Sequence, residues 1–250
     1  MADEKRLRLD QLLVQRGYYA TRSRARDAIV RRCVVAAGKV AVKSGALTDP
    51  TAAIAINDSA RNYVSRAALK LIHGLQESGF DPHQKICLDI GASTGGFTQV
   101  LLEKGAKRVY ALDVGTGQLD KSIARDDRVI ELSGINARDL SIDHLEDEHP
   151  QFLVSDVSFI SLKLALPPAL AMAQSGAKGI FLIKPQFEVG RENIGKGGIV
   201  CDKETGARSA KEICRWLDEQ DDWHVSAFMP SPIIGGDGNH EYIVAAKKND

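Results

Sequence analysis

Two patterns of apolar residues alternate from residue 85 to the end of the chain. Short runs rich in β-branched and aromatic residues predict strands, and apolar residues three or four positions apart predict helices. The predicted strands are "KICLDI", "RVYALDV", "RVIELSG", "FLVSDV", "GIFLIKP", "HVSAFMP" and "EYIVAAK". The predicted helices lie near residues 96–104, 117–124, 158–173 and 203–219. This alternation predicts an α/β fold with a doubly wound, mostly parallel sheet that binds ligands at the carboxyl ends of its strands.

The first 60 residues follow a different pattern. "LDQLLVQRG" places three leucines on one face of a helix that Gly17 would end. "ATRSRARDAIVRR" predicts a second helix with a cap at Thr21 or Ser23, and "VVAAGKVAVKSG" predicts strands with a turn at Gly38. We therefore expect two domains, residues 1–60 and 65–250, joined by a linker at residues 61–64.

Composition and hydropathy are typical of a cytoplasmic protein. The 250 residues are 44% hydrophobic and 26% charged. No apolar run approaches the roughly 20 residues that cross a bilayer, and "MADEKRLRLD" is charged where a signal peptide is apolar. The four cysteines are scattered and the six histidines lack metal-ligand spacing. We expect neither membrane association nor a bound metal.

Charge is distributed unevenly along this neutral chain. Residues 1–60 hold 11 Lys and Arg against 6 Asp and Glu, so their net charge is +5 and that of the remainder is −5. Eight of the cations lie between Arg16 and Lys43. Phosphate is the natural partner for such a basic segment, although a solvated basic helix face is the alternative.

A glycine-rich loop follows the first predicted strand of the sheet. The segment is "LDIGASTGGFT", residues 88–98. Glycines let a backbone approach a ligand closely, and an acid about 20 residues further on, here Asp113, suits the two hydroxyls of a ribose. We therefore expect a nucleoside-containing cofactor at this edge of the sheet. A tight turn is the alternative interpretation of the loop alone.

The spacing within the loop indicates which cofactor binds. A dinucleotide site needs GxGxxG, whereas this loop reads DxGxxxGG, the form found in methyltransferases that bind S-adenosylmethionine. A nicotinamide cofactor is the alternative. Phe97 could instead pack the following helix on the sheet, and Asn136 could cap a helix. The residues that we expect at the cofactor are Asp89, Gly91, Ser93, Thr94, Gly95, Gly96, Phe97, Asp113, Val114, Asn136 and Asp156.

Four polar residues lie where predicted apolar elements end. Lys70 is at the polar edge of a helix in "YVSRAALKLIHGL", and Asp156 and Lys184 follow strands. Glu241 begins the last strand. Singly, each could be a solvated charge or a helix cap. As a set at one edge of the sheet, they are candidate catalytic residues.

Two family resemblances extend this interpretation. The pattern "RLDQLLVQRG" with its following basic helix resembles, over residues 6–58, the RNA-binding domain named after ribosomal protein S-four. The order Lys, Asp, Lys, Glu resembles the tetrad of FtsJ-related ribose 2'-O-methyltransferases, whose seven-stranded, Rossmann-like class I sheet has an antiparallel last strand. With "YVSRAALKL", "SDVSFISL", "IKPQFEVG" and "GGDGNHEYIV", nearly the whole chain resembles the TlyA family.

The resemblance implies methylation of the cytidine 2'-hydroxyl in ribosomal RNA, within ribosomal subunits or free, with S-adenosylmethionine as methyl donor. It implies that Lys70, Asp156, Lys184 and Glu241 are catalytic. Lys184 would contact the 2'-hydroxyl, either as a general base or as a fixed positive charge. The residues expected at RNA are Arg6, Arg8, Arg22, Arg24, Arg26, Lys39, Arg66 and Arg138. The alternatives are a non-catalytic RNA-binding or ribosome-assembly factor and a membrane-active haemolysin.

Overall fold

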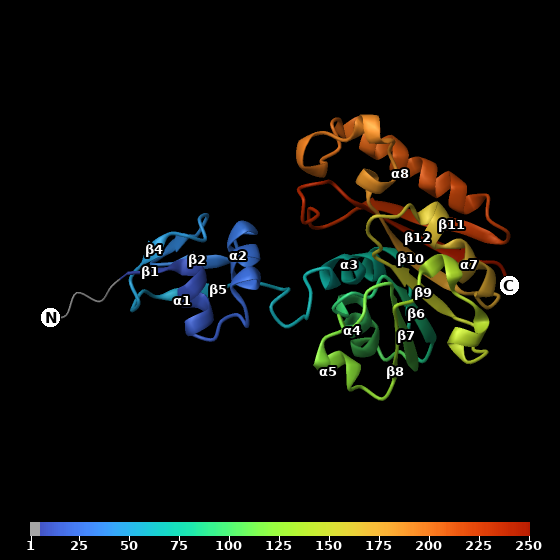
Figure 1. Cartoon of the computed structure of the whole chain (residues 1–250), viewed down its shortest axis with the longest axis horizontal. Coiled ribbons are helices and arrows are strands. Elements are labelled where there is room, and N and C mark those ends of the chain that lie inside the picture. Colours follow the sequence, from blue (N-terminus) through green and yellow to red (C-terminus); the bar gives the residue numbers. More distant parts are fainter. Residues whose placement is uncertain (1–5) are drawn as a thin grey trace. The chain divides into compact units, whose positions relative to one another are not determined.

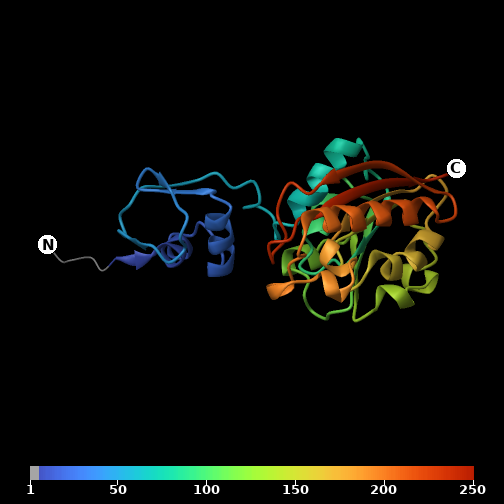
Figure 2. The same ribbon diagram turned by 90° about the horizontal axis from the view of Figure 1, so that it is seen from above.

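A computed structural model describes residues 6–250. The chain divides into two compact units, and the boundary falls between Asn62 and Tyr63, inside the linker expected at residues 61–64. Figures 1 and 2 show the two units, which are described separately below. In residues 6–250, no helix has both the length and the apolar character needed to cross a membrane.

Two helices form the framework of the smaller unit. Helix α1 spans Leu9–Gln15 and helix α2 spans Arg22–Val30. Gly17, with φ of +72°, follows α1 as predicted. Of the two candidate caps, Thr21 is the one used, because its side chain accepts a hydrogen bond from the Arg24 N–H. The helices share a buried core made by Leu9, Leu13, Ala25, Ala28, Ile29 and Val34.

Short strands complete the smaller unit. The predicted hairpin is present as β2 (Val34–Ala36) and β3 (Lys39–Val40), and β5 (Ile54–Ile56) pairs with the other side of β2. A further pair, β1 (Leu7–Arg8) and β4 (Leu47–Thr48), was not predicted, because two-residue strands leave no periodic pattern in a sequence.

The larger unit contains a seven-stranded sheet in the order β11-β12-β10-β9-β6-β7-β8. All strand pairs are parallel except those of β12, which is antiparallel to both of its neighbours. The seven predicted strands and the antiparallel last strand are therefore confirmed. Their bounds are β6 Ile86–Ile90, β7 Arg108–Asp113, β8 Val129–Ser133, β9 Phe152–Ser155, β10 Lys178–Ile183, β11 Trp223–Pro230 and β12 Tyr242–Lys248.

Helices cover both faces of this sheet (Figure 1). Helices α3 (Ala68–Ser78) and α4 (Gly96–Glu103) pack on one face. Helices α6 (Leu162–Ala165), α7 (Pro167–Met172) and α8 (Lys203–Asp218) pack on the other. Strand β10 shows why both faces are apolar: Ile180 and Leu182 belong to the first core, and Phe181 and Ile183 to the second.

Two predicted helices differ from the structure in their bounds. The helix expected at 158–173 begins only at Leu162 and is divided before Pro167, whose ring cannot continue the preceding hydrogen-bond pattern. The helix expected at 117–124 is reduced to α5 (Lys121–Ala124), because the Asp120 side chain caps it by accepting from the Ser122 N–H.

Strand order and register define the ligand-binding edge of the sheet. Strands β6 and β9 are neighbours, but the chain leaves β6 toward β7 and returns to β9, so the carboxyl ends of β6 and β9 flank a topological switch point. Ile183 pairs with Tyr242. The next residue after β10, Lys184, is therefore level with Glu241, which precedes β12 at the same edge.

Gly74 lets helix α3 approach the sheet. A Cβ at this position would lie 2.9 Å from the Ile180 Cγ2 and 3.2 Å from the Ile243 Cγ2. Both isoleucines are buried side chains of adjacent strands, so neither can move without disturbing the core. The small residue therefore sets the height of α3 above β10 and β12.

We expect Gly74→Ala to destabilise the larger unit. The gain in helix propensity is about 1 kcal/mol and overpacking a core costs about 1–3 kcal/mol, so the net loss is about 1 kcal/mol at the middle of this range. A loss of that size lowers the melting temperature by about 2–4 °C. Gly206→Ala is the matched control, because it is also helical and its Cβ would meet no atom closer than 3.5 Å. Thermal unfolding should leave the control unchanged or more stable; equal destabilisation of both would contradict the packing argument.

Candidate active site

Two adjoining cavities open at the carboxyl edge of the sheet. The smaller has a volume of about 260 Å³ and the larger about 870 Å³. Ser158, Phe159 and Phe187 line both of them. The Phe159 and Phe187 rings lie 5.2 Å apart between their centroids. Groups bound in the two cavities would therefore meet at this shared wall.

The structure brings Lys70, Asp156, Lys184 and Glu241 into one ionic network. The Lys184 Nζ lies 2.7 Å from the Asp156 Oδ1, and the Lys70 Nζ lies 3.6 Å from the Asp156 Oδ2. The Lys70 Nζ also lies 2.7 Å from the Glu241 Oε2. No side chain of the four is more than 13% exposed. Two cations and two anions thus balance within a largely buried site, in which unpaired charges would be costly.

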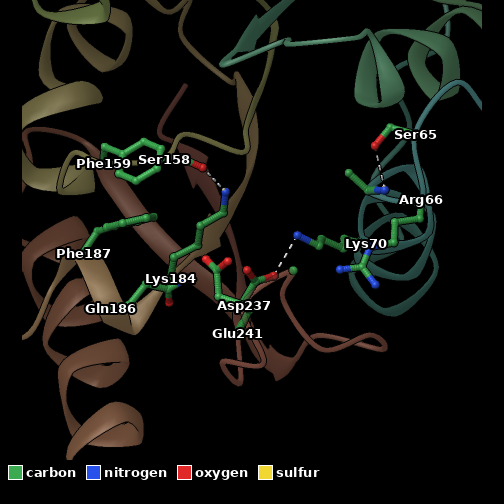
Figure 3. Close-up of a pocket in the computed structure, with 12 residues that line it drawn as sticks. Ser65, Arg66, Lys70, Ser158, Phe159, Lys184, Gln186, Phe187, Asp237 and Glu241 are labelled. Atoms are coloured by element: carbon green, nitrogen blue, oxygen red, sulfur yellow. Dashed lines mark hydrogen bonds and ion pairs between the residues drawn. The ribbon is translucent and has the colours of Figure 1, made fainter. Parts of the chain in front are cut away.

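Each member of the network comes from a different element. Lys70 projects from the first turn of α3, Asp156 follows β9, Lys184 follows β10, and Glu241 precedes β12. Figure 3 shows Lys70 and Lys184 reaching into the smaller cavity from opposite sides. Long lysine side chains from a helix and a strand therefore converge on carboxylates at the sheet edge.

Ser158 is a further polar residue of this site. Its hydroxyl lies 2.7 Å from the Lys184 Nζ (Figure 3). The same Nζ also donates to the Asp156 backbone carbonyl, at 3.4 Å. Three oxygens on the loop after β9 therefore fix one ammonium group. Ser158 was not among the predicted site residues; its only signal in the sequence is its position two residues after Asp156.

Glu188 joins the loops that follow β9 and β10. Its carboxylate accepts hydrogen bonds from the Ser161 hydroxyl, at 2.5 Å, and from the Leu162 N–H, at 2.9 Å, at the start of α6. Burial raises the pKa of Glu188 above its ordinary value, and the hydrogen bonds from Ser161 and Leu162 oppose that shift. The Lys184 loop and the Ser158 loop are thereby held together.

The larger cavity contains the acid predicted to bind a ribose. Asp113 ends β7, and its two oxygens accept hydrogen bonds from the Ser93 and Gly115 N–H groups, each at 2.8 Å. A carboxylate has about four acceptor positions, so capacity remains for a ligand. Six residues that we expected at the cofactor line this cavity: Gly91, Ser93, Asp113, Val114, Asn136 and Asp156. Asn136 also caps a turn of 3-10 helix by accepting from the Arg138 N–H.

Comparison with known proteins identifies the family. The model of the FtsJ-like methyltransferase family matches residues 63–248. The 16S/23S rRNA (cytidine-2'-O)-methyltransferase TlyA of Mycobacterium tuberculosis is 42% identical over 96% of this chain and 89% of its own length. The chain belongs to the TlyA family of FtsJ-like methyltransferases.

Other relatives of the TlyA family carry a second name. Hemolysin A of Brachyspira hyodysenteriae is 40% identical over 95% of this chain and 98% of its own length. A solved Streptococcus thermophilus structure, provisionally described as a hemolysin, is 36% identical and covers 99% of this chain and 90% of its own, with a TM-score of 0.76. The predicted family and the Rossmann-like methyltransferase fold are confirmed.

Five residues expected at the cofactor do not line the cavity of this TlyA-family chain. Phe97 is 4% exposed and packs in the core between α4 and the sheet, which was the alternative interpretation. Gly95 and Gly96 pack closely on Leu119 and Ser65 instead of facing the cavity. The carbonyl of Thr94 accepts from the Asp120 N–H, so this residue supports the loop. The fifth is Asp89.

Asp89 is in β6, two residues before Gly91, and does not line the cavity. It is fully buried, and its Oδ2 accepts a hydrogen bond of 2.7 Å from the Thr98 hydroxyl on α4. Burial raises the pKa of Asp89 to about 7, against the effect of the Thr98 hydrogen bonds and with a further contribution from the Asp156 charge. Asp89 therefore links β6 to α4 through the Thr98 hydroxyl.

The residues predicted to contact RNA are divided between the two units. Arg66 lines the smaller cavity and Arg138 the larger one. In the smaller unit, Arg6 and Lys39 are exposed, and Arg24 donates to the Arg61 carbonyl. The remaining three, Arg8, Arg22 and Arg26, form ion pairs with one carboxylate. In residues 6–250, no three or more His, Cys, Asp or Glu side chains are grouped as a metal site.

We expect Asp89→Asn to change the pH dependence of stability. The pKa of Asp89 in the folded chain, about 7, is above the unfolded value of about 3.9. Below about pH 4 this carboxyl is protonated in both states, and its stabilising contribution is complete. Between about pH 4 and 7 the unfolded chain releases the proton while the folded chain retains it, so the contribution is lost over this range and changes no further above pH 7. Relative to wild type, the variant should therefore gain stability between pH 4 and 7, on the order of 4 kcal/mol, and no more above.

Urea unfolding at several pH values measures this difference. Parallel pH profiles for wild type and Asp89→Asn would contradict the argument, because the variant lacks the titrating group.

Proposed function

We propose that this protein transfers the methyl group of S-adenosylmethionine to the 2'-hydroxyl of a cytidine in ribosomal RNA. The observation that carries the proposal is the network of two lysines and two carboxylates at the junction of the two cavities. The Mycobacterium tuberculosis relative is named for this reaction on 16S and 23S rRNA. Ribosomal RNA, free or within subunits, is the proposed substrate, and the cytoplasm the proposed location.

The larger cavity fits the proposed methyl donor. Its volume of about 870 Å³ accommodates a nucleoside with an amino-acid side arm. Asp113 retains acceptor capacity for ribose hydroxyls, and Leu112, Val114 and Ile135 provide apolar surface for a purine. Gly91 and Ser93 would contact the side arm, and Asn136 the base edge. When bound, the donor supplies an electrophilic methyl group on a positively charged sulfur.

The smaller cavity would hold the acceptor ribose. In-line displacement requires the attacking oxygen to be fixed opposite the leaving group, so the oxygen has to lie at the wall that both cavities share. The Lys184 Nζ lies 2.7 Å from the hydroxyl of Ser158, which lines that wall, and is also held by Asp156. We place the 2'-hydroxyl against this Nζ, which would receive the proton or stabilise the developing negative charge.

The other three network residues position this lysine. Asp156 directs one carboxylate oxygen to each lysine, so it fixes the separation of the two ammonium groups. Glu241 neutralises Lys70 at 2.7 Å, which leaves Asp156 available to Lys184. Arg66 and Arg138 line the two cavities and are suited to the phosphates beside the target nucleotide.

Lys184→Met should lower the rate of methyl transfer at least about 100-fold, because methionine keeps the length of the side chain but cannot donate to or take a proton from the hydroxyl. Binding of S-adenosylmethionine, measured by calorimetry, should stay within about threefold of wild type, since Lys184 lines only the smaller cavity. Lys211→Met, at an exposed position on α8, is the control. Near-normal methylation by Lys184→Met would refute the role of Lys184.

Mapping of 2'-O-methyl groups tests the function itself. Ribosomal RNA from cells with and without this protein should differ at one or more cytidines, and the purified protein should restore those methyl groups. If the protein binds both RNA and S-adenosylmethionine but methylates neither free RNA nor subunits, it is a binding factor.

A further inference from the structure

The Lys184 ammonium group has an oxygen acceptor for each of its three hydrogens. Its Nζ lies 2.7 Å from the Asp156 Oδ1, 2.7 Å from the Ser158 hydroxyl and 3.4 Å from the Asp156 carbonyl oxygen. A charged lysine has three N–H donors and no acceptor position. The group is therefore arranged as an ammonium, which has no lone pair with which to take a proton from a substrate.

The three acceptors around this ammonium differ in what else they can bind. A carbonyl oxygen only accepts, and the Asp156 carboxylate is shared between two lysines. A serine hydroxyl has one donor and two acceptor positions, and the Lys184 Nζ uses one of the acceptor positions of Ser158. Within residues 6–250, the Ser158 hydroxyl has no other hydrogen-bond partner. One acceptor position and its own proton are thus available to a ligand.

Ser158 is also the member of this group that meets solvent. The residue is exposed, whereas the Lys184 and Asp156 side chains are 11% and 13% exposed. It lines both cavities, and Figure 3 shows its hydroxyl directed at the Lys184 Nζ. A proton that reaches this hydroxyl can therefore pass to water without crossing the buried ionic network.

The backbone around Ser158 is held in one conformation. Phe159 has a φ of +64°, in the left-handed region that is unfavourable for an aromatic residue. Such strain persists only where the surrounding structure fixes the chain. On the other side of Ser158, Val157 packs on Gly91, where a Cβ would lie 3.1 Å from the Val157 Cα. The hydrogen bonds that Glu188 accepts at the start of α6 fix the end of the same loop.

We infer that the Ser158 hydroxyl is the first acceptor of the proton that leaves the 2'-hydroxyl, and that Lys184 acts as a fixed positive charge. This inference rests on the proposed function. The Lys184 Nζ and the Ser158 Oγ are 2.7 Å apart, so one oxygen can lie within hydrogen-bond distance of both. The 2'-oxygen would replace the Asp156 carbonyl, the longest of the three contacts, as an acceptor for Lys184. It would donate its own hydrogen to Ser158.

Protons and electrons balance in this arrangement. As the 2'-oxygen forms its bond to the methyl carbon, its proton passes to the Ser158 Oγ, and the proton of the serine passes to a water molecule. The electron pair of the broken carbon–sulfur bond stays on the sulfur, so one positive charge is lost there and one appears in solvent. The Lys184 charge stays in place and stabilises the oxygen as its proton leaves. The reaction therefore leaves the charge of the buried ionic network unchanged.

Two substitutions of the same shape test the role of Ser158. Threonine keeps a hydroxyl at this position, and valine replaces that hydroxyl by a methyl group on an equally branched side chain. We expect Ser158→Val to methylate ribosomal RNA about 100-fold more slowly than Ser158→Thr in a single turnover. The affinities of the two variants for S-adenosylmethionine and for RNA should agree within about threefold, because the two side chains fill the same space. Equal rates for the two variants would overturn the inference.

The number of moving protons separates proton transfer from simple positioning of Lys184. Single-turnover rates in mixtures of H2O and D2O should follow a curved dependence on the deuterium fraction in wild type and Ser158→Thr, because two protons move together. In Ser158→Val, which lacks the hydroxyl, the dependence should become linear or disappear. If Ser158 only positioned Lys184, Ser158→Val would be slower with a dependence of unchanged shape. The same shape in both variants would therefore overturn proton transfer through Ser158.

The charge of Lys184 supplies a readout that requires no methyl transfer. Nitrogen-15 NMR of the lysine side chains distinguishes a charged ammonium from a neutral amine, and the signal missing from Lys184→Met is that of Lys184. We expect a charged ammonium in wild type at neutral pH. Its hydrogens should exchange with water more slowly than in Ser158→Val, which lacks one of the three acceptors. A neutral amine at Lys184 would overturn the inference.

Failure of this inference is distinguishable from failure of the proposed function. If the wild-type protein transfers no methyl group to any ribosomal RNA, the proposed function fails and the role of Ser158 fails with it. If the wild type is active and the threonine and valine variants have equal rates, the function stands and only the role of Ser158 is eliminated.

Discussion

The candidate active site depends on one carboxylate shared between two lysines. Asp156 lies 2.7 Å from the Lys184 Nζ and 3.6 Å from the Lys70 Nζ. These contacts join a strand end, a neighbouring strand end and a helix on one face of the sheet. They persist only if α3 lies close to β10 and β12, which Gly74 permits, and if β12 runs antiparallel and starts at this edge with Glu241. The antiparallel strand is therefore a requirement of the charge balance and not a detail of topology.

The smaller unit uses the same kind of contact with a different outcome. Asp10 and Asp156 each hold more than one cation through a poorly exposed carboxylate. At Asp156 a second acid, Glu241, completes a set of two cations and two anions with no net charge. At Asp10 three arginines face one acid, so the cations stay in excess. The number of acids beside the cations distinguishes the two sites.

Much of this arrangement was predictable from the sequence, because it depends on the spacing of apolar residues and on where the apolar runs end. The seven strands follow from β-branched runs, and the four network residues from their positions where those runs stop. The cofactor loop was predicted less well. A glycine-rich sequence does not say which residues face the cavity, and Asp89, Gly95, Gly96 and Phe97 face packed elements instead. Ser158 and Asp10 were missed because their roles depend on contacts between segments distant in sequence.

The wall shared by the two cavities would link the proposed donor binding to the proposed chemistry. Ser158 and the Asp156 carbonyl hold Lys184 from the loop after β9, and the same loop lines the larger cavity. Glu188 ties that loop to the segment after β10. A displacement of the loop would therefore shift the proposed donor site and the Nζ together, which preserves their relative position. In-line displacement depends on that relative position more than on the absolute place of either group. The loop between β9 and α6 thus keeps the two cavities in a fixed position relative to each other.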